Sequence, residues 1–287
     1  MVAEIKELAC ALPATTGVPL SRWSHAELAR ELVARSVVTA ISAATVGRVL
    51  RTDAIRPWLH RSWIFPRDPD FAAKAAVALD LYAGVFEGKA LGDRELVVCA
   101  DEKTSIQARC RCHPTLPPGR ARLMRVEHEY DRGGALAYLA AYDVHRAEVS
   151  GRCEPTTGIV PFGRLVEQVM TSEPYASAER VFWIVDNGSS HRGQRSVDRL
   201  QGEWPTLRLI HLPVHASWLD QCEIYFSIVQ RKVVNPNDFT DLDQIRDRLA
   251  AFEQRYNAVA RPFDWTFGRA DLDKLLARID AHAARTA

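Results

Sequence analysis

The sequence lacks any apolar run that approaches the ~20 residues needed to cross a bilayer. Its first residues, MVAEIKELACALP, also lack the basic region and the long apolar stretch of a secretory signal peptide. These two absences argue against an integral membrane protein and against a secreted one. We therefore expect a soluble protein that works in the cytoplasm.

The sequence is also poor in cysteine and in net charge. Its six cysteines are scattered without the spacing of a disulfide framework, so we expect free thiols. The formal net charge at pH 7 is only +1, which neither demands nor forbids a nucleic-acid partner, because a basic surface can be offset by acids elsewhere. There is no internal repeat. The remaining composition, 47% hydrophobic and 25% charged over 287 residues, is that of a globular chain with room for two domains.

Two short helices are predicted near the N-terminus. Residues 24–37 place apolar side chains at helical spacing, with Ser24 as the cap and Glu27 as its capping-box partner. After a short break, SAATVGRVLRT predicts a second helix. Such a pair resembles a helix-turn-helix, although any small helical hairpin has the same pattern. In a helix-turn-helix the second helix would present to DNA the side chains of Ser42, Thr45, Arg48 and Arg51.

The segment RPWLHRSWIFPRDPD separates two parts of the chain. Its prolines, Pro57 and Pro66, interrupt the helical pattern, so it is interpreted as an irregular connector. We therefore expect residues 1–66 to form the helix-turn-helix region with its connector, and residues 67–287 to form a second domain. That domain is predicted to begin with an alanine-rich helix over residues 71–86.

Two apolar segments of the second domain each end in an aspartate. Residues 96–100 predict a buried strand that ends at Asp101, and residues 181–185 predict another that ends at Asp186, before the polar stretch NGSS. A hairpin, helices and one further strand are predicted around them, over residues 135–142 with 147–152, 162–171, 194–202, 207–212 and 218–229. This order predicts an α/β domain with a mixed sheet.

An arginine-rich segment follows the first of these strands. Residues 107–132 are rich in arginine, proline and glycine and show little periodicity, so we predict mostly loop. The loop is either a solvated basic surface or a contact for a phosphate backbone, through Arg109, Arg111, Arg120 and Arg122. Cys110, Cys112 and His113 are close together, but they lack the spacing of a zinc site.

Asp101, Asp186 and Glu223 form a candidate acidic site. If the two strands lie side by side, their aspartates meet at one edge of the sheet, and the helix that bears Glu223 can cover that edge. Three crowded carboxylates repel one another unless cations lie between them. Their hard oxygen ligands suit Mg²⁺ or Mn²⁺, and two such ions ~3.5–4 Å apart can activate a water or a 3′-hydroxyl for phosphodiester displacement.

Several motifs carry a family resemblance. DEKTSIQ, YDVHRAEVSG, IVDNGSSHRG, HLPVHASWLDQCEIYFSIVQRK and RYNAVARPFDWTF, in this order, resemble the catalytic domain of DDE transposases. More narrowly, they resemble the bacterial insertion-sequence branch of the Tc/mariner superfamily. The resemblance implies an RNase H-like fold, two Mg²⁺ or Mn²⁺ ions, and cut-and-paste transposition into a TA dinucleotide. It also implies double-stranded DNA with terminal inverted repeats as the partner, a homodimer on DNA, and a location on the bacterial nucleoid.

The resemblance also assigns roles to single positions. Asp101, Asp186 and Glu223 match the metal-binding catalytic acids, and four positions match site-supporting ones: Asn187, His191, Trp218 and Gln221. Asp220 stands where the family commonly has asparagine, so it either alters the affinity for metal or faces solvent. Family members carry a further helix-turn-helix ahead of the one seen here, so we expect the DNA-binding region to be incomplete.

Two other functions compete with this interpretation. A haloacid-dehalogenase-like phosphatase would need a second aspartate two residues after Asp101, and that position is Lys103. A transposase-derived, sequence-specific DNA-binding protein that has lost catalysis is the alternative outside the enzymes. The presence of all three acids argues against it, because binding alone does not require them.

Overall fold

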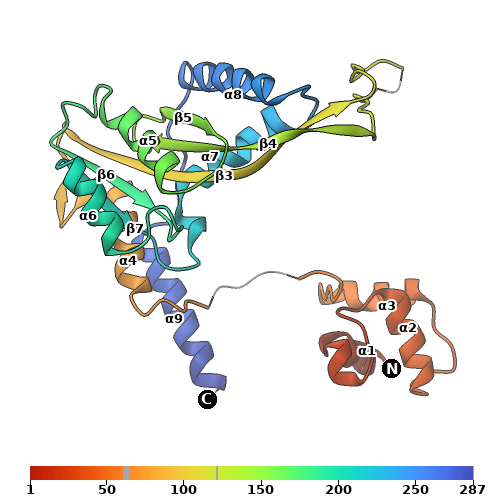
Figure 1. Cartoon of the computed structure of the whole chain (residues 1–287). Helices are drawn as coiled ribbons and strands as arrows, with labels where there is room; N and C mark the ends of the chain where they lie inside the picture. Colours follow the sequence, from red (N-terminus) through yellow and green to blue (C-terminus); the bar gives the residue numbers. More distant parts are fainter. Residues whose placement is uncertain (61–64, 121, 287) are drawn as a thin grey trace. The chain divides into compact units, whose positions relative to one another are not determined.

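The computed structural model of the chain describes residues 1–60, 65–120 and 122–286. The chain forms two compact units, Met1–Ile64 and Phe65–Ala287, and each is described by itself (Figure 1). Within the described residues, no helix is both long and apolar enough to span a membrane.

The first unit is a small all-helical body. It contains α1 (Val2–Cys10), a 3-10 turn (Pro13–Thr16), α2 (His25–Ala34) and α3 (Ala43–Thr52). Both predicted helices are present, and both predicted caps are made: the side chain of Ser24 accepts a hydrogen bond from the backbone N–H of Glu27, and Ser42 accepts one from Thr45. Helix α1 was not predicted from the sequence. Together the helices enclose a small core that includes Ile5, Trp23, Leu28, Leu32, Val46 and Leu50.

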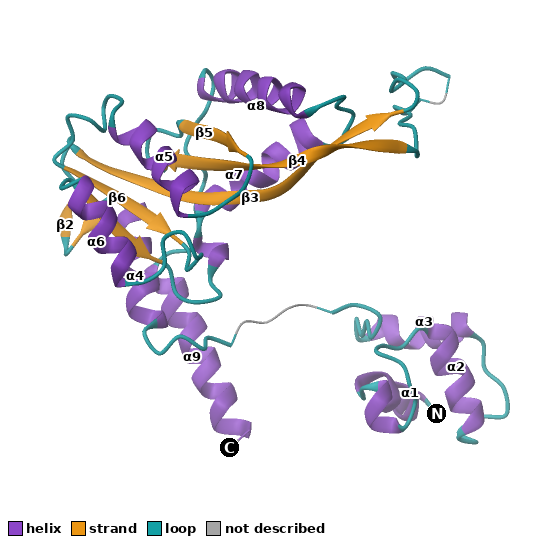
Figure 2. Ribbon diagram, in the orientation of Figure 1, coloured by secondary structure: helices purple, strands orange, loops and turns teal. Residues whose placement is uncertain are grey.

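The second unit is built on one mixed sheet. Its strands are β3 (Glu95–Arg111), β4 (Tyr130–Asp143), β5 (Val149–Glu154), β6 (Arg180–Val185) and β7 (Leu207–His211), as Figure 2 shows. The spatial order is β5-β4-β3-β6-β7. The pairs β5–β4 and β4–β3 are antiparallel, whereas β3–β6 and β6–β7 are parallel. The expected α/β class with a mixed sheet is confirmed.

The prediction of loop over residues 107–132 is wrong at both ends. Strand β3 continues to Arg111 and β4 begins at Tyr130, so the hairpin is longer than expected. The guanidinium groups of Arg109 and Arg111 lie 4.9 and 5.0 Å from the centre of the Tyr130 ring, and such cross-strand cation–π contacts stabilise the pairing. These partners are far apart in the sequence, so local periodicity gives no sign of them.

The predicted helix over residues 71–86 is also shorter than expected. Helix α4 (Phe71–Tyr82) ends four residues early, because Val85–Phe86 (β1) pairs with Lys89–Ala90 (β2) in a separate two-stranded hairpin.

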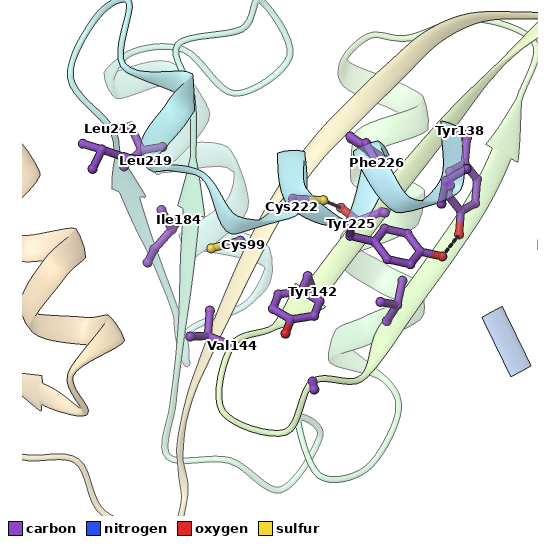
Figure 3. Packing of buried hydrophobic residues seen from close by; sticks show 14 of the residues in the cluster. Cys99, Tyr138, Tyr142, Val144, Ile184, Leu212, Leu219, Cys222, Tyr225 and Phe226 are labelled. Carbon is purple, nitrogen blue, oxygen red and sulfur yellow. Dashed lines mark hydrogen bonds between the residues drawn. The ribbon is translucent and has the colours of Figure 1, made fainter. Parts of the chain in front are cut away.

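Helices cover both faces of the mixed sheet. One face packs against α4, α7 (Gln221–Val229), α8 (Leu242–Asn257) and α9 (Arg269–Thr286), and the other against α5 (Ile159–Met170) and α6 (Gln194–Glu203). Along β3, Val97 and Cys99 point into the first core while Val98 and Ala100 point into the second, which explains the unbroken apolar run. Figure 3 shows Cys222 and Tyr225 of α7 packed in the first core with Cys99 and Tyr142.

Glu253 of α8 is a carboxyl group held against this sheet. Its Oε2 accepts hydrogen bonds from the Gly151 N–H (2.9 Å) and from the Tyr138 hydroxyl (3.2 Å), which also contacts the Tyr225 hydroxyl (3.0 Å). Burial raises the pKa of Glu253 from 4.5 to about 7. Between these pH values the unfolded chain has released the proton and the folded chain has kept it. The free energy of unfolding therefore falls as the pH rises through this window and levels off above it.

Replacing Glu253 by glutamine should stabilise the protein at pH 8, because the amide keeps an acceptor oxygen and never ionises. We expect a gain of at most about 3 kcal/mol in the free energy of unfolding at pH 8 and much less at pH 5. Urea unfolding at the two pH values measures this difference, with the exposed Glu203→Gln as control. An equal change at both pH values would contradict the assignment.

Candidate active site

Strands β3 and β6 bring Asp101 and Asp186 side by side at the point where β6 ends. The prediction that the first strand ends at Asp101 is wrong, because β3 continues to Arg111. The two strands are parallel neighbours, and Ala100 lies opposite Val185. The next residue along each strand direction is the aspartate, and neighbouring strands lie about 4.8 Å apart. Both aspartates follow residues of the first core, Cys99 and Ile184, at a spacing of two, so both belong to the sheet face that α7 covers.

Helix α7 carries Glu223 over the same place. Asp220 caps the helix by accepting a hydrogen bond from the Cys222 N–H at 2.8 Å. Cys222 is fully buried, and its Sγ lies 3.5 Å from the carbonyl oxygen of Ala140, the cross-strand partner of Asp101. Glu223 therefore occupies the first helical turn above the strand pair that holds Asp101. It is exposed, and among the described residues its side chain makes no hydrogen bond or ion pair.

The acids influence one another electrostatically. The pKa of Asp101 is raised from 3.8 to about 7, mainly by burial, with smaller contributions from the charges of Asp186, Glu223 and Glu102. Asp186 behaves oppositely: the hydrogen bond from His191 is the main cause that lowers its pKa, and the Gly188 N–H adds to it. The site therefore combines a carboxyl group that holds its proton near neutral pH with a carboxylate that stays ionised.

A hydrogen-bonded chain fixes Asp186. His191 Nε2 lies 2.6 Å from Asp186 Oδ1, which also accepts the Gly188 N–H at 2.6 Å. The other ring nitrogen lies 3.0 Å from Ser190 Oγ, and that hydroxyl donates to Glu102 Oε1 at 2.7 Å. Because His191 is fully buried, the orientation of the Asp186 carboxylate is set by packing as well as by hydrogen bonds. Ser190 and Glu102 were missed by sequence reasoning, since only the fold brings β3 and this loop together.

The other three supporting positions make no side-chain hydrogen bond to the acids in the part of the chain that the structure describes. Asn187 donates through Nδ2 to the carbonyl oxygen of Leu212 at 2.7 Å, which ties the end of β6 to the end of β7. Trp218 packs edge-on against Phe267, with ring centroids 5.2 Å apart. Gln221 is the first residue of α7 and is only 2% exposed. Asn187 therefore fixes the loop that begins at Asp186, and Gln221 anchors the start of the helix that carries Glu223.

Asp220 does not face solvent, so that expectation is wrong: the residue is 1% exposed. One oxygen caps α7, whereas Oδ2 has no hydrogen-bond partner among the described residues. Burial, and then the charge of Asp101, raise the pKa of Asp220 well above its usual range, which favours the neutral acid. A neutral carboxyl group can take the place of an asparagine amide in shape, with one fewer hydrogen to donate. Its position as an N-cap was the available signal, because aspartate is a preferred capping residue.

The candidate DNA-binding residues fall into two groups. In the first unit, the Ser42 hydroxyl is engaged in the cap of α3 and lies 2.9 Å from Thr45 Oγ1, whereas Arg48 and Arg51 are exposed. In the second unit, Arg111 donates to the carbonyl oxygens of Asn237 (2.9 Å) and Glu127 (2.6 Å) and so stiffens the hairpin. Arg109 lies beside it, and two arginines are exposed near the hairpin tip, Arg120 and Arg122.

The donor set fits a divalent cation, although no three His, Cys, Asp or Glu side chains in the described part of the chain are already placed to hold one ion. Asp101, Asp186 and Glu223 offer carboxylate oxygens, the ligands that Mg²⁺ and Mn²⁺ prefer. Burial is the main cause of the raised pKa of Asp101, and the charges of Asp186 and Glu223 add a repulsion that a cation would relieve. Glu223 is exposed, and in the ranges that the structure describes its side chain has no hydrogen bond or ion pair to break before it turns towards such an ion.

Comparison with known families and structures gives a consistent result. The model of the family described as DDE superfamily endonuclease matches residues 96–246. A search of curated proteins finds no match. Three similar solved structures are Mos1 complexes. The Mos1 mariner paired end complex with Mn has a TM-score of 0.57 and 14% identity, over 98% of this chain and 77% of that one.

The other two complexes are similar to the same degree. The Mos1 transposase paired-end complex with left transposon end has a TM-score of 0.56 and 15% identity, covering 98% and 76% of the two chains. The pre-cleavage Mos1 transpososome has a TM-score of 0.53 and 14% identity, covering 99% and 78%. At such identities the likeness concerns the fold, and it confirms the expected RNase H-like architecture.

Proposed function

The chain belongs to the DDE superfamily of endonucleases, and on that premise we propose that it is a transposase of the Tc/mariner type, from the bacterial insertion-sequence branch. The observation that carries this proposal is the meeting of Asp101, within β3, and Asp186, just after the end of the parallel neighbouring strand β6, under the helix that bears Glu223. Cleavage and strand transfer both displace an oxygen at a phosphodiester, which is the chemistry that such a carboxylate site supports.

Each residue of the site has a proposed part. Asp101, Asp186 and Glu223 would hold two Mg²⁺ or Mn²⁺ ions, which when bound would supply an activated water or 3′-hydroxyl and stabilise the leaving oxygen. His191 keeps one oxygen of Asp186 in a fixed direction and leaves the other free for a ligand role. Asp101 must release its proton when a divalent cation binds to it. The use of metal is supported by the names of the similar structures, two of which are Mos1 complexes with Mn and with Mg.

The proposed partner is double-stranded DNA that carries the terminal inverted repeats of the element, with a TA dinucleotide as target. The similar Mos1 structures are named as paired-end complexes, one of them with left transposon end, and this supports transposon-end DNA as the partner. The proposed acting form is a homodimer on DNA, in the bacterial cytoplasm on the nucleoid. In the first unit, α3 would enter the major groove with Arg48 and Arg51 towards DNA. Sedimentation of the DNA complex as a single protomer would contradict the dimer.

Metal-dependent cutting of DNA tests the proposed function. Purified full-length protein should nick or cut a duplex that carries the inverted repeats found beside the gene when Mg²⁺ or Mn²⁺ is present, and EDTA should prevent this. A duplex with scrambled repeats is the control. Specific binding without cutting in either metal would contradict the proposal and favour the DNA-binding protein that has lost catalysis.

A further inference from the structure

A polar pocket of about 220 Å³ lies beside β3. Its lining comes from two directions: one set of side chains follows Asp101 along β3, and the other follows Glu223 along α7 and the helical turn after it. The residues that matter here are Lys103, Ser105, Gln107, Arg109, Gln230 and Asn235. The lining is thus rich in hydrogen-bond donors, and both of its charged side chains are basic.

Two irregularities of β3 shape this pocket. The register against β4 shifts between Lys103 and Ile106 and again between Gln107 and Arg109, and Ser105 has a φ of 55°. Such bulges turn side chains out of the regular alternation of a strand. Asn237, which is 7% exposed, secures the bulged strand: its Oδ1 accepts the Arg109 N–H at 3.0 Å, and its Nδ2 donates to the carbonyl oxygen of Gln107 at 2.6 Å. The strand is therefore held in its irregular shape from the side of the pocket.

The basic side chains of the pocket are not ion-paired within the described residues. In the ranges that the structure describes, neither Lys103 nor Arg109 makes an ion pair with a carboxylate. Arg109 stacks on Tyr130, and its Nε is buried without a hydrogen-bond partner. A buried donor on a charged group is costly when it stays unpaired. Together these features point to an anion that completes the pocket.

The pocket continues the two elements that carry the acids. Lys103 follows Asp101 by two residues, so the two side chains start on the same face of β3 roughly 7 Å apart. Gln230 follows Glu223 by seven residues, which is two helical turns along the same face, or about 10 Å. An extended polyanion that reaches the acids would pass this pocket.

We propose that this pocket binds a backbone phosphate of the DNA strand that is cut at the acids, close to the scissile phosphate along the same strand. This inference rests on the proposed function. Lys103 and Arg109 offset the repulsion between the carboxylates and the phosphate backbone, and Gln107 and Ser105 lie beside them as neutral hydrogen-bonding groups. The pocket thereby positions the strand before any metal-dependent step.

The salt dependence of DNA binding tests this pocket. Full-length protein with Asp186→Asn, which prevents cutting, is titrated in metal-free buffer against a fluorescent duplex of the terminal repeat, over about 50–200 mM NaCl. Losing one phosphate contact lowers the slope of log K against log[salt] by about 0.9. We expect this loss for Lys103→Gln and for Arg109→Gln. Lys103→Arg should keep the slope, and so should Arg94→Gln, which removes an exposed charge at the other end of β3.

The outcomes separate this proposal from the proposed function. Unchanged slopes in both glutamine variants, with unchanged melting temperatures, would overturn the pocket even where wild-type protein cuts DNA. A slope that falls by about 0.9 in folded Lys103→Gln would support the pocket even where no cutting is seen. An equal loss in Arg94→Gln would show only a general charge effect and would overturn the assignment. Because Arg109 supports the hairpin, Lys103→Gln decides the case where Arg109→Gln does not fold.

Discussion

Asp186→Asn is expected to reduce metal-dependent DNA cutting by at least about 10²–10³-fold, the size of effect seen when one group that stabilises transition-state charge is removed. The amide keeps the shape of the side chain but has one oxygen, and that oxygen is the one His191 and the Gly188 N–H already occupy. No charged oxygen then remains for a cation. Cutting rates of the same repeat-bearing duplex, measured at saturating Mn²⁺, give the comparison.

A substitution of His191 should have a smaller effect on the same site. It touches Asp186 and not the proposed cation, so it is a positioning residue. His191→Gln should lower the rate by about 10–100-fold and raise the Mn²⁺ concentration needed for half-maximal rate, because a partner behind a ligand tunes metal affinity by that factor. A purely structural role would lower the melting temperature without moving the metal requirement. The exposed Asp273 of α9 provides the matched control, and Asp273→Asn should keep full activity.

Cutting that survives Asp186→Asn would contradict the assignment of Asp186 to the site.

The positions of Asp101 and Asp186 could be predicted from the sequence because both follow apolar runs buried on both sheet faces. Such runs are recognisable without knowledge of their neighbours. That β3 and β6 are neighbours could not be read from either run, since strand order depends on the whole sheet. The expectation that the two acids meet therefore depended on the two strands being neighbours. The structure shows that they are, with Ala100 opposite Val185.

The features that were missed all depend on long-range partners. The hydrogen-bonded chain from Asp186 to Glu102 joins the loop after β6 to β3, and its Ser190–Glu102 bond links residues 88 positions apart. The bulged pocket needs Asn237 to hold Gln107 and Arg109, and the longer hairpin needs Tyr130 beside Arg109 and Arg111. Asp220 was expected either to alter the affinity for metal or to face solvent, and only the fold shows that it is buried and that its second oxygen lacks a hydrogen-bond partner among the described residues. Local patterns predict which elements form, whereas tertiary contacts decide where several of them end and which of them meet.

The two aspartates should respond with opposite sign when each is changed to asparagine in metal-free protein. Burial and like charges raise the pKa of Asp101 from 3.8 to about 7, so the free energy of unfolding falls as the pH rises through that window and stays low above it. Asp101→Asn removes this penalty, and at pH 8 it should stabilise the apoprotein by at most about 4 kcal/mol. Asp186 has a lowered pKa because His191 and Gly188 favour its charged form, so its stabilising contribution is complete at pH 8. Asp186→Asn should therefore destabilise the apoprotein.

Bound Mn²⁺ should change the relative stabilities of wild-type protein and these variants. A ligand that binds only the folded state stabilises it by about 2.7 kcal/mol at 100 times its dissociation constant, and wild-type protein should show such a gain. Asp101→Asn should show little or none, since it lacks a carboxylate ligand, while the Asp273→Asn control should gain as much as wild type. Thermal unfolding of the four proteins at pH 8, with EDTA and with Mn²⁺, measures both effects. Two outcomes would contradict the assignment of Asp101 as a metal ligand that destabilises the metal-free protein. In the first, Asp101→Asn is less stable than wild type without metal. In the second, Asp101→Asn gains as much stability from Mn²⁺ as wild type does.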